Sequence, residues 1–457
     1  MRSDGDARTP EATGRGRGRA SRGLDGWGTY LAFLVALMPI VIPIGTFQLG
    51  IVDAFNVVAL AAFAVLLLSR RITLRAPFAA GAFVILVGSL IAVVNAVSPP
   101  ASLLALIQDA YLYVWFVMLV SVLSVRGDLV GLRLAWTGIA CVVAIIAIVG
   151  LIVVKGNTTL MGIVGPKGAR ATGTFSDPNM CADYLGMSIF ILMSLGRHMA
   201  RVLRWTIGGL LLVAIVATKS NGGALSLFVG LLVWAVVRAR TVRFPAPAIA
   251  GAALLAVSLV LSAWWMTAGL GVSNRQLEGL ESHSFLARAT HSSKGRLKIW
   301  TQLEQTLRKS PLGIGPGNSA WIQLTVEGRE RPHSMNSKEA HSDYLAYMIE
   351  RGPLALLALL FILWQAFAKV KTVWMRRVRA GTADRGTGAL VAALAGALAC
   401  SAVHSLTIER LHFRHFWLLL AIVCALAETT RVARVRPTAD ASPEQARTTE
   451  PLAVARA

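Results

Sequence analysis

The sequence predicts an all-α integral membrane protein with about twelve transmembrane helices and one long loop on one side of the membrane. Apolar runs of roughly 20 residues, the length of a helix that crosses a bilayer, recur along the chain. The chain is 55% hydrophobic and only 15% charged, with a mean hydropathy of +0.62. A soluble chain of 457 residues carries far more charge. These observations exclude an ordinary soluble domain.

Hydropathy places the predicted spans in two groups separated by the long loop. The spans are Trp27–Gly45, Leu49–Leu68, Pro77–Val97, Leu103–Val125, Gly131–Val154, Met180–Leu195, Leu203–Ala217, Gly223–Val237, Ala246–Ala268, Tyr344–Ala368, Gly388–Leu406 and Phe413–Ala427. The division predicted from them is a basic disordered tail (1–26), an N-terminal transmembrane bundle (27–268), a long extracytoplasmic loop (269–340), C-terminal transmembrane helices (341–430) and a second disordered tail (431–457).

The distribution of basic residues predicts the orientation of these spans. The net charge is +22, and most arginines lie in the tails and in short loops on the side of the N-terminus. The first two loops on the opposite side, GTFQ and SPPAS, carry no charge. Positive loops face the cytoplasm, so both termini are expected there. This pattern accounts for the arginines without nucleic-acid binding, which is not expected.

Within the long loop, the stretch GRLKIWTQLEQTLRKS (295–310) has apolar residues at near-helical spacing. It predicts an amphipathic helix that lies on the membrane or on the bundle. The following PLGIGPGN is interpreted as a glycine turn, because GIGPG lacks the lysine and the strand–helix context of a phosphate-binding loop.

Four residues on the outward side are candidates for chemistry: Arg170, Lys219, Arg296 and His341. Each alone has an ordinary explanation, such as a solvated arginine, a lysine that reaches past a span end, or a histidine at a helix start. Together on one side of the membrane, the three cations and the histidine indicate a site for an anionic ligand such as a pyrophosphate. No HExxH, nucleophile elbow or carboxylate cluster is present. Neither a metal nor a cofactor is therefore expected.

Successive segments of the chain resemble the O-antigen ligase and polymerase superfamily. They are RATGTFSDPNMCADYL, KSNGGALSL, GRLKIWTQLEQTLRKSPLGIGPGN and HSDYLAYMIERGPLALL. His341, Ser342 and Gly352 match the pattern His-(Asn/Ser)-x₉-Gly at its spacing. Two departures occur. Ala355 stands where a second glycine is expected, and Asn221 stands in a turn that often reads Ser-Arg-Gly, where Lys219 could compensate.

The resemblance implies a metal-independent, GT-C-like membrane glycosyltransferase in the bacterial cytoplasmic membrane, with an extracytoplasmic active site. Its donor would be an oligosaccharide on a polyprenyl diphosphate, and its acceptor a glycan or glycolipid of the cell envelope. Arg170 and Arg296 would bind the diphosphate and stabilise its leaving charge, with Lys219 helping. His341 would accept the proton of the acceptor hydroxyl. Whether such an enzyme is a ligase or a polymerase stays open.

Two other classes of function remain as alternatives. One is a membrane transporter of a small anion, which should hold its polar groups inside the spans. The other is a non-catalytic subunit of an envelope polysaccharide assembly complex, which would need none of the four outward residues. Since Asp53 and Asp109 are the main charges expected within spans, the transferase is preferred.

Overall fold

The computed structural model describes residues 25–40, 51–127, 129–153, 170–175, 177–242, 300–301, 303–319 and 341–432. These residues form helices and connecting turns, with no strand among them. Eleven of the twelve predicted spans coincide with helices, and the twelfth, Ala246–Ala268, lies outside the described residues. The all-helical class is therefore confirmed, and the number of spans stays a prediction.

Among the described residues, six helices are long and apolar enough to cross a membrane: α5, α6, α8, α9, α13 and α14. The helices are α2 (Asp25–Leu37), α3 (Ile51–Leu68), α4 (Ala79–Val93), α5 (Pro99–Arg126), α6 (Leu129–Val153), α7 (Pro178–Ser194), α8 (Arg201–Thr218), α9 (Asn221–Val242), α13 (Asp343–Arg379), α14 (Arg385–His404) and α15 (Arg414–Val432), with a short 3-10 turn, η1 (Gly196–His198). Together these elements make a multi-pass membrane protein.

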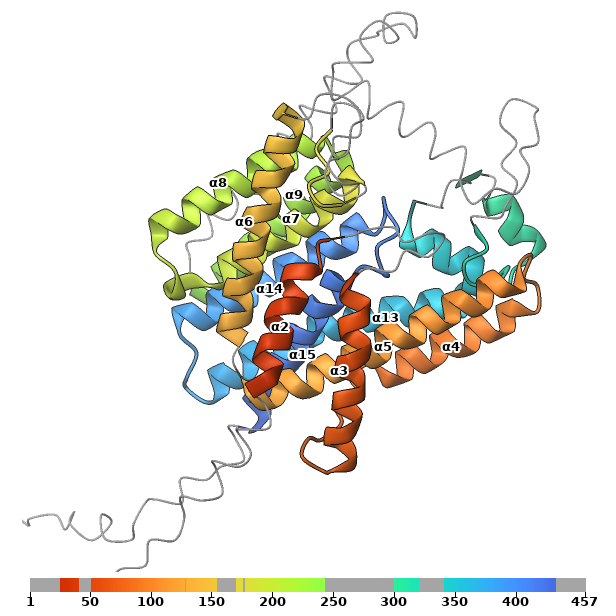
Figure 1. Cartoon of the computed structure of the whole chain (residues 1–457), viewed down its shortest axis with the longest axis horizontal. Coiled ribbons are helices and arrows are strands. Elements are labelled where there is room, and N and C mark those ends of the chain that lie inside the picture. The colour runs from red at the N-terminus through yellow and green to blue at the C-terminus, as the bar shows by residue number, and fades with distance from the viewer. Residues whose placement is uncertain are drawn as a thin grey trace, which may run out of the picture.

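The C-terminal helices α14 and α15 lie in the middle of the bundle (Figure 1). Helix α14 packs against α7 and α9, α15 packs against α5, and α13 runs along α4. Small residues permit the closest of these approaches. A Cβ atom on Gly230 of α9 would lie 2.8 Å from the carbonyl oxygen of Gly396 on α14. Such contacts are typical of helices that associate within a bilayer, where apolar surface alone gives little driving force.

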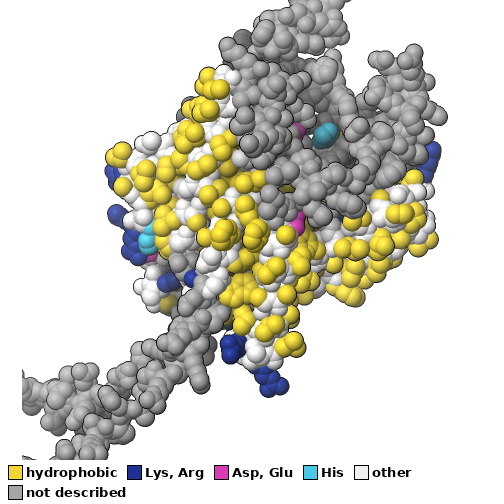
Figure 2. Space-filling model, viewed as in Figure 1, with side chains coloured by type: hydrophobic (Ala, Val, Ile, Leu, Met, Phe, Trp, Pro, Cys, Tyr) yellow, Lys and Arg dark blue, Asp and Glu magenta, His cyan; other side chains and the backbone are white. Residues whose placement is uncertain are grey.

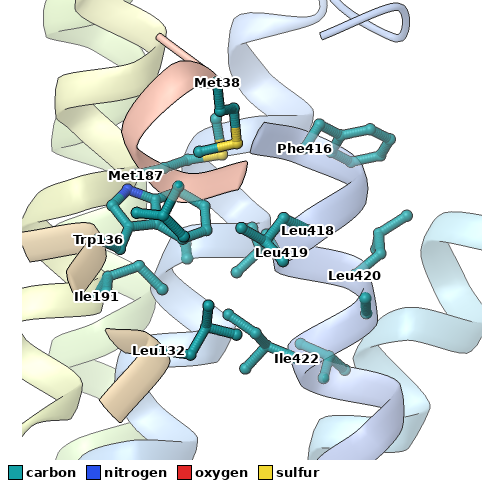
Figure 3. Packing of buried hydrophobic residues seen from close by; sticks show 14 of the residues in the cluster. Met38, Leu132, Trp136, Met187, Ile191, Phe416, Leu418, Leu419, Leu420 and Ile422 are labelled. Carbon is teal, nitrogen blue, oxygen red and sulfur yellow. The ribbon is translucent and has the colours of Figure 1, made fainter. Parts of the chain in front are cut away.

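Large side chains fill the space between these helices. Figure 3 shows Trp136 of α6, Met187 of α7 and Leu418 and Leu419 of α15 within one buried cluster. The outer surface is also apolar, since the face in Figure 2 is covered largely by hydrophobic side chains with basic ones near its edges. An apolar exterior around an apolar core is expected of a protein that lipid surrounds.

The helices alternate in direction, so the bundle has two distinct ends. At the first, which we call the basic end, Arg75 forms an ion pair of 2.5 Å with Glu428, and Arg133 donates to the carbonyl oxygen of Ser194 at 2.8 Å. The opposite end, which we call the His341 end, contains the starts of α3, α5, α7, α9, α13 and α15. It also contains Arg170 and the turn between α8 and α9.

The predicted amphipathic helix of the long loop rests on the bundle. Residues 300–301 and 303–309 are helical, and Leu303 is buried in a small cluster with Ile314 and Ile349. Trp300 and Leu307 pack against the same cluster. This packing places the loop helix beside the start of α13.

Candidate functional site

Arg170 lies against the C-terminal turn of α8. Its Nε donates to the carbonyl oxygen of Thr218 at 2.9 Å, and its Nη2 donates to Oδ1 of Asn179 at 3.0 Å. The next backbone amide, of Ala171, donates to the carbonyl oxygen of Ala217. These bonds hold the half-buried guanidinium beside the turn that contains Lys219.

The turn between α8 and α9 is held by the same asparagine. Ser220 donates from its hydroxyl to Asn179 Oδ1 at 2.8 Å, and its Oγ accepts from the backbone amide of Gly223 at 3.1 Å, which caps α9. Lys219 ends α8 in a left-handed conformation with φ 51°. Asn179 therefore joins Arg170 to this turn, so two of the predicted site residues lie together.

Asn221, which replaces the arginine common in the related turn, is the first residue of α9. Lys219 precedes it by two residues and is half-buried at the end of α8. Compensation of the missing guanidinium by Lys219 stays a prediction.

His341 lies two residues before the start of α13 and is held by the connection between α14 and α15. Its backbone amide donates to Oε1 of Glu409 at 3.1 Å, and its φ is 53°. Ser342 caps the helix, and the amide of Asp343 donates to the carbonyl oxygen of Ser405 at 2.9 Å. Contacts with adjacent segments of the protein thus fix a backbone conformation that is uncommon for a non-glycine residue.

A buried charged network, which the sequence analysis missed, lies behind this end of the bundle. Asp183 of α7 bonds to His404 Nδ1 and His415 Nε2, each at 2.8 Å. Arg410 donates from Nη1 to both carboxylate oxygens of Asp183, at 3.1 and 3.3 Å. All four side chains are at most 2% exposed. A carboxylate buried to this degree is tolerated only with such partners.

Arg410 also connects this network to the start of α13. Its backbone amide donates to Oδ1 of Asp343 at 2.9 Å, and its Nη2 donates to the hydroxyl of Ser401. Its guanidinium lies over the ring of Phe416, 4.6 Å from the centroid. Through its side chain and its backbone amide, this one residue therefore ties together α7, α13, α14 and α15.

The same α14–α15 connection meets the turn that holds Lys219. A Cβ atom on Gly222 would lie 2.2 Å from Oγ1 of Thr407 and 3.3 Å from a ring carbon of His404. Within this connection, burial and the nearby Arg414 guanidinium lower the pKa of His412 to about 4, so its ring is neutral at physiological pH. The loop from Ser405 to Phe413 thus contacts both the Lys219 turn and His341.

The glycine turn after the loop helix docks onto a kink in α13. Gly352 has φ 79° and ψ 174°, which breaks the helix, and a Cβ atom there would lie 2.7 Å from the carbonyl oxygen of Leu312. Glu350 accepts from the amide of Gly317 at 2.8 Å and from the hydroxyl of Ser319 at 2.6 Å. The predicted turn is confirmed, and it also anchors the long loop to the helix that begins next to His341.

Arg296, the remaining predicted site residue, lies outside the described residues. Across the part of the chain that the structure describes, no group of three or more histidine, cysteine, aspartate or glutamate side chains is arranged to hold a metal ion. The expectation of a metal-independent site remains a prediction.

The functional candidates that the sequence analysis missed are Asn179, Asp183, Glu409 and Arg410. One signal was available. The stretch from His404 to His415, HSLTIERLHFRH, puts three histidines and two arginines into a short connection on the side that the sequence predicts to face outward. Such a charge density departs from the positive-inside pattern and indicates a role other than topology.

The fold and this end of the bundle define a polytopic helical membrane protein with a polar site where its helices and one long loop meet. Residues 207–360 match the family model of the O-antigen ligase, and the resemblance to the O-antigen ligase superfamily is thereby confirmed. The matched residues run from α8 to α13 and include Lys219, His341 and Gly352. A search of curated proteins found no match. This family match supports a role in envelope polysaccharide assembly.

Proposed function

We propose that the protein transfers or polymerises a glycan from a polyprenyl diphosphate carrier onto an acceptor sugar hydroxyl at the outer face of the bacterial cytoplasmic membrane. The observation that carries this proposal is that one connected set of contacts joins His341 to Arg170 and Lys219. Lys219 and His341 also lie within the region that matches the O-antigen ligase family. Both termini are cytoplasmic in this proposal, and the His341 end faces outward.

The reaction replaces one bond at the anomeric carbon by another. The acceptor oxygen forms a bond to that carbon, while the bond from the carbon to the diphosphate oxygen breaks. The bonding electrons leave with the diphosphate, which remains attached to the lipid. His341 accepts the proton of the acceptor hydroxyl and later releases it to water.

The leaving diphosphate gains negative charge, which fixed cations stabilise. Lys219 supplies positive charge from the α8–α9 turn, and Arg170 supplies it from beside that turn. By the resemblance, Arg296 adds a third cation from the long loop, whose anchor at Glu350 and Gly352 brings the loop to α13. Arginine suits this role because its planar fork matches phosphate oxygens.

The buried network around Asp183 is the feature that a transporter of a small anion would share. Its position argues for the transferase, because the network lies at one end of the bundle and its arginine is already paired with a carboxylate. A pathway for an anion would instead need cations along the spans.

A complementation experiment tests the proposed function. The gene is deleted and restored as wild type or as His341→Ala, and surface glycans and lipid extracts are compared on gels. Wild type should restore the glycan, and His341→Ala should insert normally and accumulate the lipid-linked donor. If the variant shows single repeat units in place of the ladder of long glycans, the enzyme is a polymerase. If the variant leaves long chains attached to the lipid carrier, the enzyme is a ligase. Equal restoration by both versions would contradict the catalytic role of His341.

A further inference from the structure

Two polar residues on one face of α7 each hold one half of the proposed site. Asn179 and Asp183 are four residues apart, so their side chains project from the same side of the helix. We propose, on the basis of the proposed function, that both are positioning residues. Through them α7 sets the distance between the phosphate-binding turn and His341.

Asn179 acts on the phosphate-binding half. Its side-chain oxygen accepts from Arg170 Nη2 at 3.0 Å and from the Ser220 hydroxyl at 2.8 Å. One atom therefore fixes the guanidinium relative to the turn that contains Lys219. Loss of this oxygen would keep both cations in the protein but would no longer fix the position of Arg170 relative to Lys219.

Asp183 acts on the half that contains His341. Its two carboxylate oxygens bind His404 of α14, His415 of α15 and Arg410 of the connection between these helices. The carboxylate is only 1% exposed, so partners from two helices and their connection hold it without water access. This arrangement fixes the end of α14 and the start of α15 against α7.

From Arg410 the connection to His341 is short. The amide of Arg410 donates to Asp343, the first residue of α13, and the adjacent Glu409 accepts from the backbone amide of His341. Displacement of the α14–α15 connection would therefore displace His341. Because a misplacement of about 1 Å can reduce a reaction rate roughly 100-fold, these residues affect turnover without touching substrate.

The test is a kinetic comparison of variants of the full-length protein in lipid nanodiscs. The donor is the lipid extract of the deletion strain, which supplies the accumulated carrier-linked glycan, and membranes of that strain supply the acceptor. Initial rates are measured against the amount of extract. Asn179→Ala should raise the apparent KM for the donor about fivefold or more, and Asp183→Asn should reduce kcat at least roughly tenfold at an unchanged KM.

A second pair of variants tests the last link and does not depend on the folding of Asp183→Asn. Glu409→Ala should lower kcat, and Glu409→Gln, which keeps an oxygen acceptor for the amide of His341, should restore it. Ser188→Ala is the control, because Ser188 lies on α7 and accepts from the indole of Trp136 at 2.9 Å, away from the site. It should lower thermal stability and leave both kinetic constants unchanged.

The outcomes separate this inference from the proposed function. If wild type does not transfer glycan from the extract, the proposed function fails. If wild type is active and His341→Ala is inactive, but Asn179→Ala and Glu409→Ala keep wild-type constants, only the positioning role is overturned. The same conclusion follows if Ser188→Ala changes kcat as much as Glu409→Ala does, because the effect would then reflect stability.

Discussion

Lys219 and His341 share a backbone conformation that is uncommon for residues with side chains, with φ values of 51° and 53°. Each is held by a contact of its own backbone amide: Lys219 donates to the carbonyl oxygen of Val216 at 3.0 Å, and His341 donates to Glu409. Residues in sparsely populated conformations gather at functional sites, where surrounding contacts enforce them. The directions of these two side chains are therefore set by the turns that contain them and not by their position on a helix face.

The role of Lys219 predicts a specific rescue. Lys219→Met should raise the apparent KM for the lipid-linked donor roughly tenfold, because a charged hydrogen bond to phosphate contributes about 1.5 kcal/mol. Adding Asn221→Arg, which recreates the Ser-Arg-Gly turn common in the related proteins, should restore donor affinity. Transfer rates with the donor extract measure both effects.

Lys309→Met is the matched control for this pair. Lys309 is an exposed cation at the end of the loop helix, so its loss removes the same charge from the same end of the molecule. It should leave donor affinity within about twofold. A similar rise in KM for Lys309→Met would mean that Lys219 acts only through long-range attraction.

At the scale of elements, α13 shows what hydropathy can and cannot locate. The predicted span ended at Ala368, whereas the helix continues to Arg379. The extension contains five basic residues, so the hydropathy falls there although the helix continues, because lysine and arginine are good helix formers. The kink at Gly352 was not predicted either, because its cause is the approach of the Leu312 carbonyl oxygen from the distant loop.

Gly352→Ala should destabilise the protein by about 1–3 kcal/mol. Its φ and ψ belong to a region that only glycine adopts readily, and the added Cβ would meet the carbonyl oxygen of Leu312 at 2.7 Å. Thermal unfolding in detergent should show a lower midpoint, and glycan transfer should fall because the loop loses its anchor.

Gly138→Ala provides the comparison for this prediction. Gly138 lies within α6, and a Cβ atom there would meet nothing within 4 Å. Alanine should leave stability unchanged or raise it by up to about 1 kcal/mol, through helix propensity alone. Equal midpoints for the two variants would show that the loop does not dock on the kink as described.

At the scale of the whole molecule, the alternating helices put the candidate residues and the basic loops at opposite ends. Two single-cysteine additions test which end faces outward. Lys309→Cys and Thr382→Cys both introduce exposed thiols, and three of the four native cysteines are buried, with Cys141 half-buried within α6. A membrane-impermeant maleimide should label Lys309→Cys in intact cells and Thr382→Cys only after permeabilisation. The reverse pattern would contradict the proposed orientation.

The sequence predicted the described helices well and named part of the candidate site. Apolar runs are local signals, and so were the motifs that pointed to Arg170, Lys219 and His341. The partners of Asp183 are 221 to 232 residues away along the chain, so no local pattern could pair them. Asp183 itself lies between apolar residues of a span, where a single carboxylate hardly changes hydropathy. Packing of the whole bundle was needed to reveal the network.

The ion pairs at the His341 end also constrain how the protein is made. Asp183 binds an arginine 227 residues further along the chain, and Asp53 binds Arg414 across 361 residues. During synthesis both carboxylates enter the membrane long before their partners leave the ribosome, and an unpaired buried charge is strongly unfavourable. Until α14 and α15 arrive as a pair, the earlier helices form an unfinished assembly. A chain truncated after α14 would therefore be expected to reach the membrane and then be recognised as incomplete by quality-control proteases.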